Sequence, residues 1–303
     1  MAFTLLAGSS HPALAHELAR QLGVSLGECS IERFPDGESQ IEVQCAVRGQ
    51  EVFVLQALCA PVGEHLLELT MMADAIHRGG ARSVTAVVPY LGYARQDRRE
   101  LGREPLGARV MAELLSAGRI DRLVCLDLHS RAVEGCFPQA VEHASAVAAL
   151  AAQLADVPRP AVVISPDLGA VKRAEAYAQL LDLPVAIIHK QRLTGSDVSV
   201  RGVVGAVKGL FPVVVDDMIS TGGTMAASIQ AVLDAGAQPQ VTIVASHGLF
   251  VGQAFERLGK LPIRKIVVTN SVPQLAQVPF KIQVISAAPM LAAVVTRLVE
   301  ENR

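Results

Sequence analysis

The sequence predicts an α/β protein whose sheets are mostly parallel, and two observations support this fold class. Short runs of apolar, often β-branched residues alternate along the chain with longer alanine- and leucine-rich segments of helical period. These short runs are apolar throughout, as expected for strands that helices cover on both faces. Because the chain has 303 residues and a domain usually has about 100–200, we expect two such domains.

The predicted elements follow one another in a regular order. The strands are expected at residues 4–7, 52–56, 84–89, 123–127, 162–165, 185–188, 213–216, 241–245 and 266–269. The helices are expected between them, at residues 12–22, 63–77, 106–117, 171–181 and 224–235. This is more strands than one ordinary open sheet holds. We therefore expect a division near residues 140–160, where alanine-rich sequence gives way to Val157-Pro158-Arg159-Pro160.

Composition excludes several classes of function. The chain has 27 basic and 29 acidic residues, which argues against a general nucleic-acid or membrane-surface binder. Its longest apolar stretch, residues 144–155, is shorter than the ~20 residues that span a bilayer, and no basic segment precedes the apolar N-terminal stretch. The five cysteines are scattered and form no CxxC pair. We expect a cytoplasmic protein that has no nucleic-acid or membrane partner.

Residues 213–224 carry the most information about function. They form an apolar strand, an acidic pair, a loop of small residues and the start of a helix. Backbone N–H groups at such a helix start favour phosphate binding, and adjacent carboxylates can accept hydrogen bonds from a diol. The alternative is a plain helix cap with solvated acids. The residues predicted to hold a ribose 5-phosphate group are Asp216, Asp217, Ser220, Thr221, Gly222, Gly223 and Thr224.

A second segment, residues 89–99, follows a predicted strand and is rich in arginine. Arginine side chains bind polyphosphate oxygens through two hydrogen bonds at once, so this segment suits a triphosphate, although a solvated loop would have similar composition. The sequence contains neither GxxxxGK[ST] nor GxGxxG. The residues predicted to bind ATP here are Arg95, Gln96 and Asp97.

These two segments and several shorter ones resemble the ribose-phosphate diphosphokinase family over nearly the whole chain. The shorter segments are residues 33–38 (RFPDGE), 127–129 (DLH), 165–167 (SPD), 189–192 (HKQR) and 268–271 (VTNS). The resemblance implies two similar phosphoribosyltransferase-type domains, each a mostly parallel sheet flanked by helices. The first would comprise residues 1–145, joined by a C-terminal helix at 287–303, and the second residues 146–286.

The resemblance also implies an activity and roles for individual residues. The enzyme would use Mg²⁺ and transfer the diphosphate of ATP to the C1 hydroxyl of ribose 5-phosphate, giving phosphoribosyl diphosphate and AMP. Phe34 would stack on adenine while Asp36 and Glu38 bind its polar edge from a neighbouring subunit, which requires a homo-oligomer with an intersubunit ATP site. Gly37, between them, would belong to the same ATP-binding segment. Lys190 and Arg192 would close over the phosphates as catalytic residues, preceding a loop at 193–197. His129 and Asp167 would lie at the metal.

Plainer interpretations remain open at each position. Residues 35–37 are typical of a simple hairpin turn, Asp167 could cap the following helix, His129 could be structural, and a basic pair is often surface charge. Two positions depart from the family pattern: Ala170 follows Gly169 where a second glycine is common, and Ser220 stands where Asp is frequent. The alternative functions are a phosphoribosyltransferase, or a catalytically silent regulatory relative in hetero-oligomers.

Overall fold

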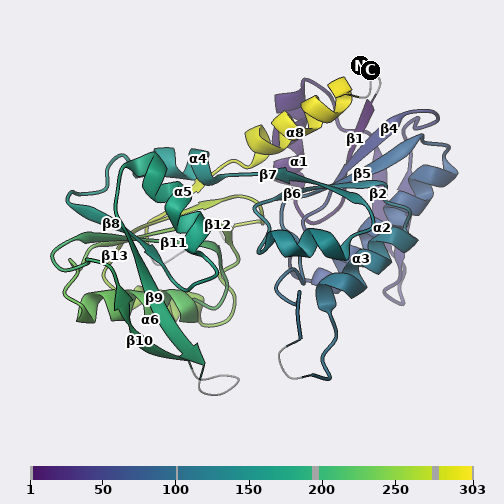
Figure 1. Ribbon diagram of the computed structural model, residues 1–303. Coiled ribbons are helices and arrows are strands. Elements are labelled where there is room, and N and C mark those ends of the chain that lie inside the picture. Colours follow the sequence, from purple (N-terminus) through teal and green to yellow (C-terminus); the bar gives the residue numbers. More distant parts are fainter. Residues whose placement is uncertain (1–2, 100–101, 193–197, 275–279, 302–303) are drawn as a thin grey trace. The chain divides into compact units, whose positions relative to one another are not determined.

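The computed structural model describes residues 3–99, 102–192, 198–274 and 280–301, with the backbone alone at 190–192 and 198–201. The chain forms two compact units (Figure 1). The first comprises Met1–Ser145, Ser271–Pro273 and Ser286–Arg303, and the second comprises Ala146–Asn270 and Gln274–Ile285.

The first unit is built on a five-stranded parallel sheet. Its strands, in spatial order, are β1 (Phe3–Ala7), β4 (Glu51–Leu55), β5 (Ser83–Val88), β6 (Arg122–Leu126) and β7 (Ala140–Ala144). Helices α1 (Pro12–Leu22) and α8 (Ala288–Glu301) cover one face, and α2 (Val62–Arg78) and α3 (Gly107–Ala117) cover the other (Figure 1). A separate antiparallel hairpin is formed by β2 (Cys29–Arg33) and β3 (Ser39–Val43).

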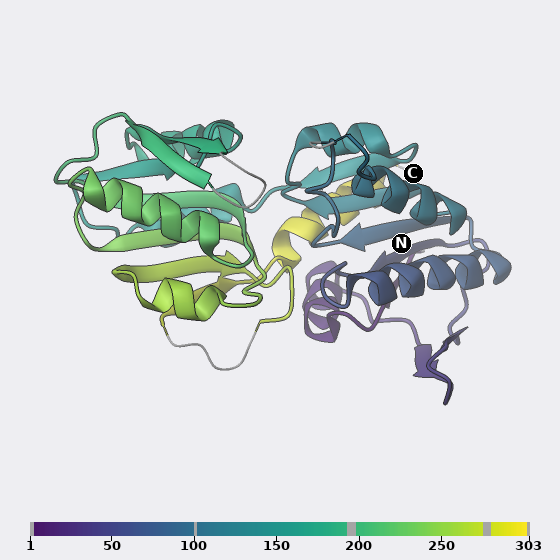
Figure 2. The same ribbon diagram turned by 90° about the horizontal axis from the view of Figure 1, so that it is seen from below.

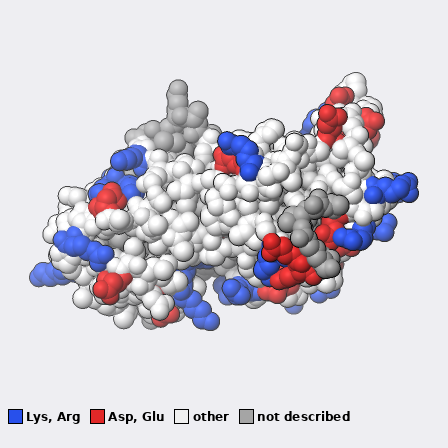
Figure 3. All heavy atoms as spheres, turned by 90° about the horizontal axis from the view of Figure 1, so that it is seen from above, with Lys and Arg blue, Asp and Glu red and all other residues white. Residues whose placement is uncertain are grey.

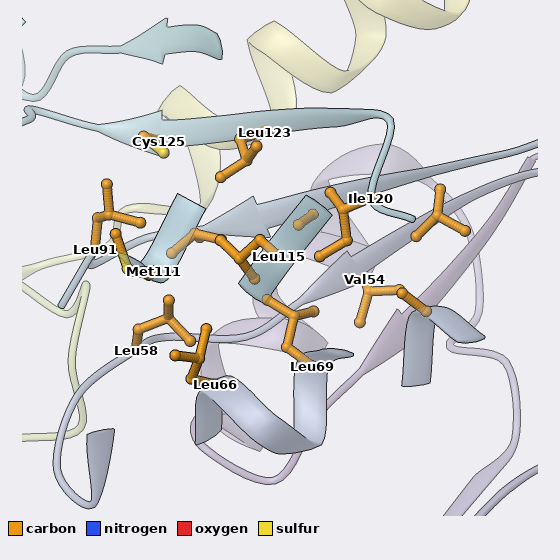
Figure 4. Close-up of a cluster of buried hydrophobic side chains, with 14 of the residues drawn as sticks. Val54, Leu58, Leu66, Leu69, Leu91, Met111, Leu115, Ile120, Leu123 and Cys125 are labelled. Carbon is orange, nitrogen blue, oxygen red and sulfur yellow. The ribbon is translucent and has the colours of Figure 1, made fainter. Parts of the chain in front are cut away.

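The core of this unit shows why these segments take these structures. Val54 of β4 and Leu123 of β6 point toward Leu69 of α2 and Leu115 of α3 (Figure 4). The two helices supply apolar side chains at helical spacing, and their buried stripe covers strands that are themselves apolar. Cys125 lies in the same cluster, where burial raises the pKa of its thiol to about 12.

The second unit is built on a seven-stranded sheet in which only one edge pair is antiparallel. Its strands, in spatial order, are β10 (Val198–Val204), β9 (Val185–Arg192), β8 (Ala161–Ser165), β11 (Phe211–Ile219), β12 (Val241–Gly248), β13 (Ile263–Thr269) and β14 (Ile282–Ile285). The antiparallel pair is β9 with β10, and the other neighbours are parallel.

Helices cover both faces of this second sheet. Helix α5 (Val171–Leu181), with α4 (Val147–Ala151) and the short 3₁₀ turn η2 (Ala152–Leu154), lies on one face. Helices α6 (Gly223–Asp234) and α7 (Ala254–Gly259) lie on the other, and α6 lies in front of the strands when seen from below (Figure 2). The central strands β8, β11 and β12 are buried along almost their whole length. Residues at their carboxyl ends are therefore held on a rigid support.

The predicted fold class is confirmed, and all nine predicted strands and five predicted helices are present. The prediction missed β7, β10 and β14, which form edges of the two sheets. The hairpin turn that the sequence indicated at residues 35–37 is present between β2 and β3. β7, β10 and β14 include polar residues, such as Glu142 and His143 in β7, so their sequences lack a continuous apolar run like that of the edge strand β1. No helix in the described part of the chain is long and apolar enough to cross a membrane.

Gly92 allows a tight packing contact just after β5, which yields a first prediction. A Cβ atom at this position would stand 2.6 Å from both the Leu58 carbonyl oxygen and a methyl carbon of Val62. Because one of these atoms is backbone, Gly92→Ala should lower the free energy of unfolding by about 1–3 kcal/mol. Gly63→Ala is the control, since a Cβ there would meet no atom within 4 Å. Equal denaturant midpoints for the two variants would contradict this packing argument.

Candidate functional site

The strongest candidate site begins in the C-terminal half of β11, in the middle of the second sheet. Asp216 and Asp217 follow the buried run Val213-Val214-Val215, and β11 has β8 and β12 as parallel neighbours. Their carboxylates lie close together, because one nitrogen of Arg173 is within 3.6 Å of both. The side chain of Asp217 is only 3% exposed and that of Asp216 is 15% exposed. The fold thus holds two adjacent acids largely out of water.

One cation from α5 reaches both acids. The Nη1 atom of Arg173 lies 3.5 Å from Oδ1 of Asp216 and 3.6 Å from Oδ1 of Asp217. Asp216 Oδ1 also accepts a 2.9 Å hydrogen bond from the backbone N–H of Asp217. Burial, and then the nearby charge of Asp217, still raise the pKa of Asp216 well above its ordinary value. This arrangement leaves a carboxylate that would gain from hydroxyl donors.

The loop after the acids leads into α6 and leaves that helix without a side-chain cap. Gly222 has φ 74°, a left-handed conformation that favours glycine, and a Cβ there would stand 3.2 Å from Cγ of Leu258. The N–H groups of the first helical turn have no partner within the helix. Ser220, Thr221 and Thr224 are all at least partly exposed around them. The local geometry is that of an anion-binding helix start.

The loop is braced from the neighbouring strand. After β12, the N–H groups of Leu249 and Phe250 donate to the Ile219 carbonyl at 2.9 and 3.0 Å, and Val251 N–H donates to the Ser220 carbonyl at 3.1 Å. These bonds fix the backbone just before the helix start. A ligand bound there would therefore meet N–H groups already in place.

Asp167 follows β8, the neighbour of β11, and part of its carboxylate is already engaged. Its Oδ1 accepts a 3.0 Å hydrogen bond from the N–H of Ala170, the residue just before α5, but α5 itself has no side-chain cap. Its carbonyl accepts a 2.7 Å hydrogen bond from the Ser165 hydroxyl. Its other carboxylate oxygen has no hydrogen-bond partner among the described residues. One oxygen thus remains for a ligand, a water or a cation.

The predicted catalytic pair lies on β9, next to β8. Lys190 and Arg192 belong to this strand and align with Val200 and Val198 of β10. Their side chains, and the loop predicted at 193–197, lie outside the described residues.

In the first unit, the arginine-rich segment follows β5 and is anchored to α3. The backbone carbonyl of Gln96 accepts a 3.2 Å hydrogen bond from Ala108 N–H. The side-chain oxygen Oε1 of Gln96 packs so close to Gly107 that a Cβ atom there would stand only 2.4 Å from it. Tyr93 turns the chain with φ 60°. Arg95 is exposed and has no ion-pair partner within the described ranges, and Asp97 is half-buried. Gln96 thus anchors a loop whose arginine remains available to an anion.

Two more predicted groups lie in the first unit. Residues 34–38 form the tight turn between β2 and β3, where Glu38 N–H donates to Asp36 Oδ1 at 3.1 Å, Gly37 has φ 94° and Phe34 is 45% exposed. Arg33, just before this turn, forms an ion pair with Glu64 of α2. His129 is exposed two residues beyond Asp127, whose Oδ1 accepts a 2.8 Å hydrogen bond from the Ser145 hydroxyl.

Each unit therefore gathers its own set of predicted residues. The first carries the hairpin turn, the arginine-rich segment and His129, and the second carries Asp167, Lys190, Arg192 and the 216–224 segment. The described residues contain no group of three or more His, Cys, Asp or Glu side chains that could hold a metal. On the face shown in Figure 3, basic and acidic side chains are interspersed among uncharged ones.

The sequence prediction missed two arginines. Arg173 lies in the first turn of α5, six residues after Asp167, and its position after a strand end was the available signal. Arg257 lies on α7, and its Nη1 donates to the Thr221 carbonyl at 3.3 Å. Nothing local in the sequence links residue 257 to the loop, because tertiary packing alone brings them together.

Comparison with known proteins agrees with these features. Residues 3–118 match the family described as the N-terminal domain of ribose phosphate pyrophosphokinase, and residues 139–280 match the phosphoribosyl transferase domain. The chain is 40% identical to ribose-phosphate pyrophosphokinases of Caldanaerobacter subterraneus subsp. tengcongensis and Bacillus caldolyticus, over 98% of this chain and 94% of each relative. It also resembles the crystal structure of a phosphoribosylpyrophosphate synthetase from Mycobacterium smegmatis, with a TM-score of 0.92, 38% identity and full coverage of both chains.

The raised pKa of Asp216 predicts a pH-dependent stability defect in the ligand-free protein. The folded carboxyl group binds its proton more tightly than the unfolded one, whose ordinary pKa is 3.8. Stability should therefore fall as pH rises from about 4 through the raised pKa. Asp216→Asn removes this loss, which amounts to about 1.4 kcal/mol for each unit of pKa difference. Its melting temperature should match that of the unmodified protein at pH 4 and exceed it at pH 8.

Asp234→Asn is the matched control, because Asp234 is exposed at the end of α6. Its melting temperature should differ from that of the unmodified protein by the same small amount at both pH values. If Asp216→Asn raised the melting temperature by the same amount at pH 4 and pH 8, the stabilisation would not come from removing an ionisable group.

Proposed function

This chain belongs to the ribose-phosphate pyrophosphokinase family, and we propose that it transfers the diphosphate group of ATP to the C1 hydroxyl of ribose 5-phosphate. The observation that carries this proposal is the continuous structure of β11, the 220–222 loop and α6, with two acids followed by an uncapped helix start. The acids suit a sugar diol and the helix start suits its phosphate.

Asp216 and Asp217 would bind the two ring hydroxyls of ribose. Hydrogen bonds from hydroxyl groups stabilise the ionised form of Asp216, so sugar binding would offset the cost of burying that charge. Arg173 acts as a positioning residue, because it contacts both carboxylates at 3.5 and 3.6 Å. The phosphate would lie against Ser220, Thr221, Gly222, Gly223 and Thr224. Contacts to the ring hydroxyls and to the phosphate would together fix the orientation of the C1 hydroxyl for attack on ATP.

ATP would be held by residues of the first unit. Arg95 is exposed and free of ion pairs among the described residues, as a triphosphate ligand requires. Gln96 and Asp97 belong to the same anchored loop. Phe34, Asp36, Gly37 and Glu38 would bind adenine from a second copy of the chain. The half-exposed Phe34 ring and the fixed turn support this homo-oligomer proposal.

The residues present fit a magnesium ion that arrives with the triphosphate. Magnesium prefers oxygen ligands and often binds through one or two carboxylates plus substrate phosphates. Asp167 offers one carboxylate oxygen without a hydrogen-bond partner among the described residues, and His129 would lie near the phosphates. When bound, the ion neutralises phosphate charge.

The reaction would be an in-line displacement at the β-phosphorus of ATP. A bond forms between the C1 oxygen and the β-phosphorus, while the bond from the β-phosphorus to the oxygen bridging it to the α-phosphorus breaks. AMP leaves with that bridging oxygen, and the hydroxyl proton passes to solvent. Lys190 and Arg192 would stabilise the negative charge that develops around the β-phosphorus. Most of the acceleration would come from positioning and charge neutralisation.

The alternatives explain less of the chain. A phosphoribosyltransferase accounts for residues 139–280 but leaves the match over residues 3–118 without a role. A catalytically silent relative would need neither Lys190 nor Arg192, and both are present.

Product analysis is the most direct test of the proposed function. The protein is incubated with ATP, ribose 5-phosphate and Mg²⁺, and the reaction is monitored by phosphorus NMR. AMP and phosphoribosyl diphosphate should form in equal amounts. A reaction without ribose 5-phosphate is the control. ADP or inorganic phosphate as the main product would refute the proposal.

Substitution of Lys190 tests the proposed catalytic role. Lys190→Ala should lower turnover by at least ~10²-fold, because losing one charge-stabilising donor costs about 2.7–4 kcal/mol in comparable sites. The affinity for ATP should change much less, since the contribution is made mainly in the transition state. An affinity loss as large as the turnover loss, measured by titration calorimetry, would make Lys190 a ground-state ligand instead.

A further inference from the structure

A guanidinium group that the sequence prediction missed lies beside the start of α6. Arg257 Nη1 donates to the Thr221 carbonyl at 3.3 Å. The same nitrogen lies 3.6 Å from the place where a Cβ on Gly223 would stand, and Thr221 Oγ1 lies 3.7 Å from that place. A cation, a hydroxyl group and the first residue of α6 thus lie around one point.

Packing between α7 and the loop holds Arg257 there. Leu258 and Ala254 of α7 are fully buried, and both are near neighbours of Gly222. Arg257 precedes Leu258, so its side chain leaves the helix at the exposed edge of this contact. Gln253 Oε1 accepts a 3.1 Å hydrogen bond from Arg257 Nη2. The guanidinium is thus held by an amide on α7 and a carbonyl in the loop.

Arg257 forms no ion pair within the described residues, and the neighbouring Glu256, whose pKa is lowered by Lys260 and to a smaller extent by the charge of Arg257, is paired with Lys260 instead. No carboxylate lies within ion-pair distance of it in the part of the chain that the structure describes. Lys260, which follows the same helix, does have such a partner, because its Nζ lies 2.7 Å from Oε1 of Glu256. The Ser220–Thr224 loop contains no basic residue. A phosphate dianion bound there would otherwise meet only neutral donors.

We propose that Arg257 binds the 5-phosphate of ribose 5-phosphate, which adds a cationic contact to the backbone and hydroxyl donors of the loop. This inference rests on the proposed function. Arginine can donate two parallel hydrogen bonds to phosphate oxygens, and the neutral partners of Arg257 leave its charge available. Gln253 is a positioning residue, since it restrains the guanidinium from the side of α7.

Steady-state kinetics of Arg257→Gln, Arg257→Lys and Lys260→Gln test this role. Losing one charge-assisted contact should raise the KM for ribose 5-phosphate by roughly 10- to 100-fold, while the KM for ATP and kcat stay within about threefold. Arg257→Lys should recover part of the loss, because it keeps the charge. Lys260→Gln removes the same charge from the residue that follows α7 and should behave like the unmodified enzyme.

Direct binding separates this inference from the proposed function. Titration calorimetry with ribose 5-phosphate should show weaker binding to Arg257→Gln than to Lys260→Gln, with equal melting temperatures for the two ligand-free proteins. If the unmodified protein makes phosphoribosyl diphosphate and Arg257→Gln has an unchanged KM for ribose 5-phosphate, only the role of Arg257 is overturned. A variant whose melting temperature, kcat and both KM values change together would show that Arg257 is structural, which also overturns it. If the unmodified protein makes no phosphoribosyl diphosphate, the proposed function fails independently.

Discussion

The burial of two neighbouring carboxylates in the C-terminal half of β11 is the constraint on which the candidate site of the second unit depends. A strand in the centre of a parallel sheet gives its last residues a fixed position and little water. Two acids in such a place repel each other and lose hydration. Arg173 contacts both, yet the pKa of Asp216 remains raised. The ionised form of Asp216 is therefore unfavourable in the ligand-free protein, and hydrogen bonds from a polar ligand would stabilise it.

Other features of the second unit serve to hold that strand end and the loop after it. The hydrogen bonds from residues 249–251 fix the backbone of Ile219 and Ser220, and α7 packs against Gly222. Rigid donors are more effective for an anion than mobile ones, because no ordering is needed when the ligand binds. The buried acids, of which Asp216 destabilises the ligand-free protein when ionised, therefore precede a loop whose backbone donors are already fixed for ligand binding.

The sequence predicted the interior of both sheets better than their edges or the full set of residues near the loop. Continuous apolar runs identify β8, β11 and β12, because these strands are buried on both faces. β7, β10 and β14 have no such run, so only the tertiary structure defines them. The 216–224 segment was recognisable because its residues are contiguous. Arg173 and Arg257 come from other helices, and no local pattern reveals which residues a distant helix brings close.

The C-terminal helix α8 has a consequence for how the chain is made. It belongs to the first unit, where it packs on α1, β6 and β7, buries Leu291 and Val295, and pairs Arg297 with Glu142 at 2.8 Å. A ribosome synthesises the N-terminal part first, and domains usually fold in that order. Here the apolar face that α8 covers stays open while the whole second unit is being synthesised. The first unit can reach its final packing only after α8 has left the ribosome, and until then this apolar surface is exposed to water.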